Sequence, residues 1–317
     1  MEELSLNSIS FKKLQRFRTS LAAICGFSFF IMALGSLVRS TDSGLACPDW
    51  PMCYGQLVPY FDYQIFLEWF HRLLAGLLTV SFVYFLWQVF TSPLLRKVFL
   101  KQFIVSFGLL AAQVILGGLT VLKLLNAKVV SLHLVNAILF LSVLLWMLAK
   151  AQHMIKNVTA LDFSANKKEV LSLRDSKMAT SVLGVFAILV FAQMTLGGMV
   201  SSNNAGLICP DFPLCMGKWI PDLSFLVSVQ VFHRFLAYLL LIASVGLFFI
   251  LRKRKLPLVV SLSIKLIPTL MALQILLGVA NVVYRLPPLL SSLHLANALL
   301  IYIFAVWSYF YLRIEGS

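Results

Sequence analysis

The sequence predicts an all-α integral membrane protein of eight transmembrane helices. We expect two tandem four-helix bundles, related by a pseudo-two-fold axis along the membrane normal. Of the 317 residues, 60% are hydrophobic and 12% are charged, and the mean hydropathy is +0.92. Such a composition indicates lipid rather than water as the main solvent. Uncharged stretches long enough to cross a bilayer recur along the chain, and a set of motifs repeats after 161 or 162 residues.

A transmembrane helix needs about 20 consecutive, mostly apolar residues. Eight stretches meet this length once a turn of flanking sequence is allowed at the two shortest. We therefore predict spans at residues 20–38, 66–90, 99–122, 128–150, 178–200, 226–251, 260–283 and 289–312.

The basic residues that give the net charge of +14 are distributed unequally across the predicted membrane topology. If the N-terminus is cytoplasmic, 19 of the 26 Lys and Arg residues fall on the cytoplasmic side. Cytoplasmic loops of membrane proteins carry such an excess of positive charge, so both termini are expected in the cytoplasm. This distribution argues against nucleic acid as a partner.

The motifs of the first half recur in the second. Residues 35–55 read GSLVRSTDSGLACPDWPMCYG and residues 197–217 read GGMVSSNNAGLICPDFPLCMG, with 11 of 21 positions identical. Phe-His-Arg at 70–72 recurs at 232–234, and the Ser-Leu-His-Leu-x-Asn-Ala motif at 131–137 recurs at 292–298. Gln113 likewise has a counterpart in Gln274.

Each half holds four spans, so both halves enter the membrane from the same side and form a parallel repeat. The predicted units are an N-terminal bundle over residues 1–150, a cytoplasmic linker over 151–177 and a C-terminal bundle over 178–317.

Four of the five histidines belong to the repeat: His71, His133, His233 and His294. Each lies one or two turns inside the outer end of an even-numbered span, at a similar depth. Two histidines per bundle at matching height suit a haem bound by an imidazole on each face. The alternative is that each histidine serves as a hydrogen-bonding residue between helices. A buried ionisable residue in a span is costly, which favours a functional role.

Two arginines, Arg72 and Arg234, directly follow histidines near helix N-termini, where the helix dipole disfavours a cation. An anionic partner such as a haem propionate would offset this cost. Snorkelling to the membrane surface is the alternative.

Four cysteines form two pairs, Cys47 with Cys53 and Cys209 with Cys215, in loops predicted to face outward. Two ligands are too few for a closed zinc site. A structural disulfide and a redox-active pair both remain open, because the outer compartment permits disulfides.

Glu68 lies three residues before His71, on the same helical face, whereas the corresponding residue of the second half is Gln230. This difference predicts that the two sites do different work. A plain ion pair between Glu68 and a nearby arginine is the alternative.

Taken together, these residues resemble the haem A synthase family over nearly the whole chain. The resemblance rests on the eight spans, the duplication, Glu-x-x-His-Arg at 68–72 with Gln-x-x-His-Arg at 230–234, the Ser-Leu-His-Leu-x-Asn-Ala pair and the cysteine loops. It implies oxidation of the C8 methyl group of haem O to a formyl group, giving haem A for terminal oxidases.

The resemblance also implies roles for the two halves. His71 and His133 would bind the substrate haem O with Glu68 as an essential acid, and His233 and His294 would bind a permanent haem b. Partners would be membrane lipid, the haem O synthase that supplies substrate and a quinone or another electron acceptor. The paired cysteines imply a bacterial plasma membrane.

Two other functions fit part of the pattern. A di-haem electron carrier linked to quinol would also need paired histidines, but it usually places its haems at two depths. A transporter is the third option, since repeats and polar residues at the midplane are common there, but the sequence has no pair of Pro-broken spans and few charges at the midplane.

Overall fold

The computed structural model describes residues 8–162 and 173–316, and this part of the chain is helical without a β-strand. Its eight long helices are each long and apolar enough to cross a membrane, which confirms all eight predicted spans. They are α1 (Ser8–Ser40), α2 (Tyr63–Thr91), α3 (Pro93–Leu122), α4 (Ala127–Asp162), α5 (Leu173–Ser202), α6 (Phe225–Leu251), α7 (Leu258–Val283) and α8 (Pro288–Glu315).

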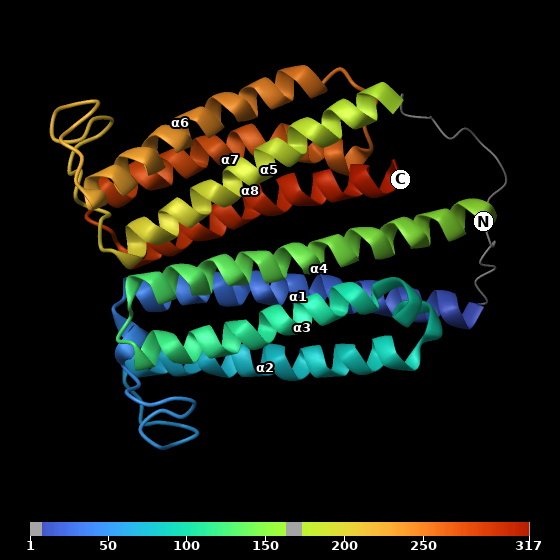
Figure 1. Ribbon diagram of the computed structural model, residues 1–317, viewed down its shortest axis with the longest axis horizontal. Helices are drawn as coiled ribbons and strands as arrows, with labels where there is room; N and C mark the ends of the chain where they lie inside the picture. Colours follow the sequence, from blue (N-terminus) through green and yellow to red (C-terminus); the bar gives the residue numbers. More distant parts are fainter. Residues whose placement is uncertain (1–7, 163–172, 317) are drawn as a thin grey trace.

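The helices form two groups that lie side by side, α1–α4 and α5–α8 (Figure 1). Two long segments, 41–62 and 203–224, protrude at one end of the molecule, which we call the loop end. Helix α1 begins and helix α8 ends at the opposite end, which we call the terminal end.

The two groups meet through α1, α4, α5 and α8, with α1 packed on α8 and α4 packed on α5 and α8. Hydroxyl groups bridge this interface, as between Ser142 and Tyr302 at 2.8 Å and between Ser131 and Ser202 at 2.9 Å. The contact of α1 with α8 corresponds through the repeat to that of α5 with α4. The pseudo-two-fold axis itself stays a prediction.

Local sequence explains where the even-numbered helices begin. Asp62 caps α2, since its carboxylate accepts the backbone N–H of Gln64 at 2.9 Å, and Ser224 caps α6 at the corresponding place in the repeat. Pro288 opens α8 at a position where its missing N–H costs nothing. These features fix where three of the four histidine-bearing helices, α2, α6 and α8, begin.

All eight helices extend beyond the spans predicted for them, α1 and α4 furthest. Helix α1 begins at Ser8, α4 continues to Asp162 and α5 begins at Leu173, so both ends of the predicted linker 151–177 are helical. The remaining linker residues lie outside the described part of the chain, and the division into two domains stays a prediction. His153 lies on this extension of α4, beside Asn157 at 3.0 Å.

The core of the first group is aromatic near the terminal end. Phe17, Phe82, Phe85 and Phe103 are almost fully buried and their rings pack on one another, with centroids 4.6 Å apart for Phe82 and Phe103. Cys25 is also buried there, as expected for a core residue. This packing leaves the loop end of the bundle for the polar residues of the repeat.

Candidate functional site

The four repeated histidines lie at one level, near the loop end. His71 and His233 lie eight residues into α2 and α6, and His133 and His294 lie six residues into α4 and α8. At a rise of 1.5 Å per residue, these positions are about 9–12 Å from the helix starts.

Each histidine ring packs on a glycine of the preceding helix. A Cβ built on Gly35 of α1 would lie 3.0 Å from Cε1 of His71, and one on Gly197 of α5 would lie 3.0 Å from Cε1 of His233. A Cβ on Gly117 of α3 would lie 3.4 Å from Cε1 of His133, and one on Gly278 of α7 would lie 3.3 Å from Cε1 of His294. An added Cβ would crowd the ring at Gly35, Gly197 and Gly278, whereas at Gly117 it would make ordinary van der Waals contact.

The imidazoles fit a haem. The Nδ1 atom of all four is buried without a hydrogen-bond partner in the described part of the chain, so none of these rings bridges two helices through that nitrogen. No group of three or more His, Cys, Asp or Glu side chains suited to a metal ion occurs within residues 8–162 and 173–316. Haem iron needs only two protein ligands, since the porphyrin supplies the others.

Glu68 is buried and has two partners. Its Oε1 lies 2.5 Å from Nη2 of Arg72, and its Oε2 accepts the backbone N–H of Cys47 at 2.8 Å. The ion pair that the sequence left as an alternative is therefore present. Because the carboxylate lies about one turn from His71 on the same helix, an ion pair and a role beside a haem are compatible.

The second half lacks this arrangement. Gln230 donates to the backbone carbonyl of Gly206 at 3.3 Å, and its own Oε1 is buried without a partner. Arg234 binds only backbone carbonyls in the described structure, those of Cys209, Asp211 and Leu214. The sequence difference between Glu68 and Gln230 is therefore also a difference in bonding.

Both arginines hold the cysteine loops. Arg72 donates to the carbonyls of Asp49 at 2.6 Å, Met52 at 2.7 Å and Cys47 at 3.2 Å, as Arg234 does in its own half. These contacts supply the electron-rich partners that a cation at a helix N-terminus needs. A role toward haem propionates stays a prediction.

Both predicted cysteine pairs form disulfides, with Cα atoms 4.8 Å apart for Cys47–Cys53 and 4.6 Å for Cys209–Cys215. A redox-active role for either pair stays a prediction. Within each loop an aspartate closes a turn. Asp49 accepts the N–H of Tyr54 at 2.6 Å and of Gly55 at 2.8 Å, and these bonds hold the pKa of Asp49 below its ordinary value of 3.8.

The two loops dock differently. In the first half, the Trp50 ring lies 3.0 Å from where a Cβ of Gly118 would be, so the loop rests on α3. In the second half, Phe212 instead lies over Arg234 and beside Tyr238 of α6.

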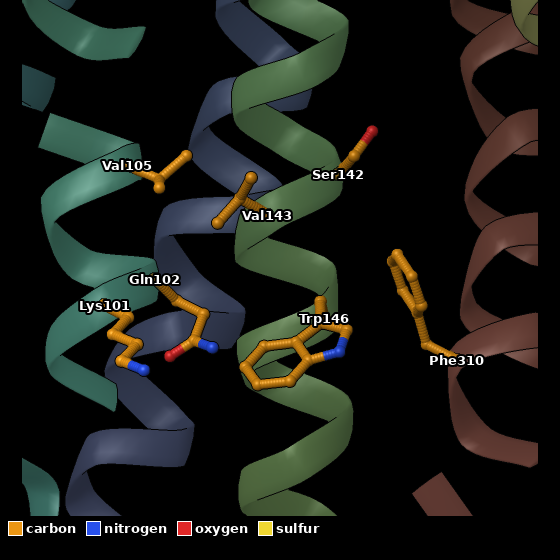
Figure 2. Close-up of a pocket in the computed structure, with 7 residues that line it drawn as sticks. All are labelled: Lys101, Gln102, Val105, Ser142, Val143, Trp146 and Phe310. Carbon is orange, nitrogen blue, oxygen red and sulfur yellow. The ribbon is translucent and has the colours of Figure 1, made fainter. Parts of the chain in front are cut away.

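A cavity of about 320 Å³ lies elsewhere, between α3, α4 and α8. Figure 2 shows Lys101 and Gln102 of α3, Trp146 of α4 and Phe310 of α8 around it. None of the four histidines lines this cavity. We therefore place the candidate site at the loop end instead.

Sequence reasoning missed the four glycines and gave Gln113 no role. All five stand in repeated segments, so the repeat itself was the signal that could have found them. Gln113 contacts the ring of His133 at 3.2 Å between Nε2 atoms.

Comparison with known proteins bears on the same residues. The sequence matches the family COX15-CtaA, described as cytochrome oxidase assembly protein, over residues 18–64 and 60–306. The chain belongs to this family. The match covers all four histidines and both disulfide loops, so the predicted family resemblance is confirmed.

Individual relatives agree with the family. A protein of Shewanella oneidensis named heme A synthase is 28% identical over 92% of this chain and 95% of its own length. One of the same name from Halalkalibacterium halodurans is 32% identical over 70% of this chain and 72% of its own. A third, from Geobacillus thermodenitrificans, is 30% identical over 67% of this chain and 65% of its own.

Proposed function

We propose that the protein is an oxidoreductase of haem A biosynthesis that converts the C8 methyl group of haem O to a formyl group. The observation that carries the proposal is the contrast between Glu68, bound to Arg72 and Cys47, and Gln230 at the same place in the repeat. Family membership and the names of the relatives support the pathway.

The substrate haem O is assigned to His71 and His133, and a haem b to His233 and His294. When bound, haem b would supply a group that accepts electrons from the substrate. The unpartnered Nδ1 atoms and the glycines behind the rings support two sites of one design.

Conversion of methyl to formyl requires two rounds of oxidation. In each round the carbon loses two electrons and a proton and gains hydroxide from water, which gives first an alcohol and then a gem-diol. The gem-diol loses water to leave the aldehyde. Glu68 is proposed to take the proton from the attacking water or to stabilise positive charge at the carbon, since a buried carboxylate suits either task.

Arg72 and the loop determine where the Glu68 carboxylate points. Arg72 holds Oε1, and the N–H of Cys47 holds Oε2, so each oxygen keeps a free lone pair in a fixed direction. Arg72 is thus a positioning residue. Its positive charge also offsets the negative charge of the Glu68 carboxylate next to the bound haem.

The electrons removed from the substrate would pass on to an acceptor outside the protein, for which a quinone is proposed. The supplier of haem O is proposed to be a haem O synthase in the same bacterial plasma membrane. The charge distribution, with 19 of 26 Lys and Arg on one side, supports cytoplasmic termini and an outward-facing loop end.

The second candidate is a di-haem electron carrier. It is disfavoured because all four histidines lie at one level near the loop end, which does not conduct electrons across the membrane.

One experiment separates the two functions. The protein is produced with a source of haem O, and its non-covalent haem is extracted and separated by chromatography. Haem A in the extract supports the synthase. Haem B alone, reducible by quinol, supports the carrier, and an extract without haem contradicts both.

A further inference from the structure

A series of amide hydrogen bonds runs beside one histidine in each half. The two series are the same except at the last bond. In the first half, Asn136 donates through Nδ2 to the Leu109 carbonyl at 2.8 Å and to Oε1 of Gln113 at 2.7 Å. In the second half, Asn297 donates to the Leu270 carbonyl at 2.9 Å and to Oε1 of Gln274 at 2.7 Å.

These bonds fix the orientation of both glutamine amides. Because Oε1 accepts from the asparagine, Nε2 must point the other way as a donor. In the second half, Nε2 of Gln274 donates to the backbone carbonyl of His294 at 3.0 Å. In the first half, Nε2 of Gln113 instead contacts Nε2 of the His133 ring at 3.2 Å.

The amide N–H of Gln113 therefore points at the lone pair on Nε2 of His133, which iron would need. An amide N–H donates to a ring nitrogen that carries no proton, and iron binds the same unprotonated atom. Nδ1 of His133 is enclosed by protein, which leaves Nε2 as the nitrogen for iron. Iron binding at His133 must break the bond from Gln113.

The second half has no such competition in its described residues. The amides of Gln274 and Gln193 donate to the backbone carbonyls of His294 and His233, at 3.0 Å each, and leave the rings alone. The position that corresponds to Gln193 in the first half is Ile31, which has no amide.

We infer that Gln113 is a positioning residue that weakens iron ligation by His133 and so speeds release of haem from the first half. The inference rests on the proposed function, in which this half must exchange substrate for product while the other half keeps its haem. A neutral hydrogen bond of this kind is worth about a five-fold change in an equilibrium constant.

The test replaces Gln113 by Met, which has a similar length but no donor; Asn136 keeps its bond to Leu109. The purified protein, loaded with haem O and haem B, is mixed with excess apomyoglobin as a haem acceptor. The haems that remain are separated by chromatography over time. We expect haem O and haem A to leave about five-fold more slowly, with haem B release unchanged.

The matched control is Gln274→Met, which should slow the release of neither class of haem. If Gln113→Met does not fold, Gln113→Leu serves the same purpose. Unchanged or faster release of haem O and haem A would overturn the inference, as would equal slowing of haem B. Wild-type protein that binds no haem O or haem A would instead overturn the proposed function, and this inference with it.

Discussion

The backbone N–H of Cys47 donates to Oε2 of Glu68 over 2.8 Å, so the first disulfide loop and the buried carboxylate form one unit. The same carboxylate is bound to Arg72, which also holds the carbonyls of the loop. The orientation of the Glu68 carboxylate therefore depends on the path of this loop.

Glu68→Gln is expected to leave haem bound at His71 and His133 but to lower the yield of haem A by about 100-fold or more. The reason is that acid–base catalysis by a positioned side chain contributes about 10²–10⁴ in rate. Chromatography of extracted haem measures the yield, and the optical spectrum measures binding. Glu315→Gln, which removes the carboxylate bound to Lys156 at the terminal end, is the control. An unchanged yield in Glu68→Gln would remove the catalytic role.

The two cysteine pairs should differ in their effect on turnover. Replacing Cys47 and Cys53 by Ser frees the N–H that orients Glu68, whereas replacing Cys209 and Cys215 disturbs a loop whose neighbour is Gln230. We expect the first double variant to lose more haem A yield, with both loops equally sensitive to protease. Equal losses of yield in the two variants would contradict this coupling.

The first loop should withstand acid. The N–H groups of Gly55 and Tyr54 lower the pKa of Asp49 below 3.8, so its carboxylate stabilises the folded loop at all pH values above 3.8. That contribution is lost as the pH falls through the lowered pKa. The rate at which a phosphine reduces Cys47–Cys53 should therefore rise only below pH 3.8.

Asp49→Asn provides the comparison for this measurement. It should show faster reduction than the wild-type protein above pH 3.8 and no step in acid, because the amide does not titrate. If the reduction rate of the wild-type protein stepped up at or above pH 3.8, the turn would not be stabilising the ionised carboxylate of Asp49.

Gly35→Ala is expected to displace the His71 ring, since the added Cβ would lie 3.0 Å from Cε1. Overpacking of this kind typically costs about 1–3 kcal/mol. We expect a lower ratio of haem to protein and loss of the low-spin spectrum of the first site. Gly76→Ala on α2, where no atom lies within 4 Å of the added Cβ, should bind haem normally and melt at the same or a higher temperature. Equal haem content and equal melting temperature of the two variants would show that Gly35 does not position the His71 ring.

The features predicted from sequence are those that depend on local composition or on comparison of the chain with itself. Eight spans follow from apolar length, and the histidines, Glu68 and the cysteine pairs follow from the repeat. Helix ends were less accurate, because α1 and α4 continue as helices beyond the apolar stretch.

The contacts of the site could not be predicted, because they depend on how each helix is rotated. Helices such as α3 are apolar on most faces, so no polar stripe shows which face meets the histidines. The partners of Arg72 depend on the path of a loop closed by Cys47–Cys53, and the bond between Gln113 and His133 depends on an amide that Asn136 orients.

The glycine behind each histidine ties together two positions that are far apart in the sequence. A change at Gly35 or Gly117 acts on the ring of the next helix rather than on its own helix. The two members of each pair should therefore evolve together. In a relative that has lost the counterpart of His71 or His133, the matching glycine is released from constraint, and larger residues become acceptable there.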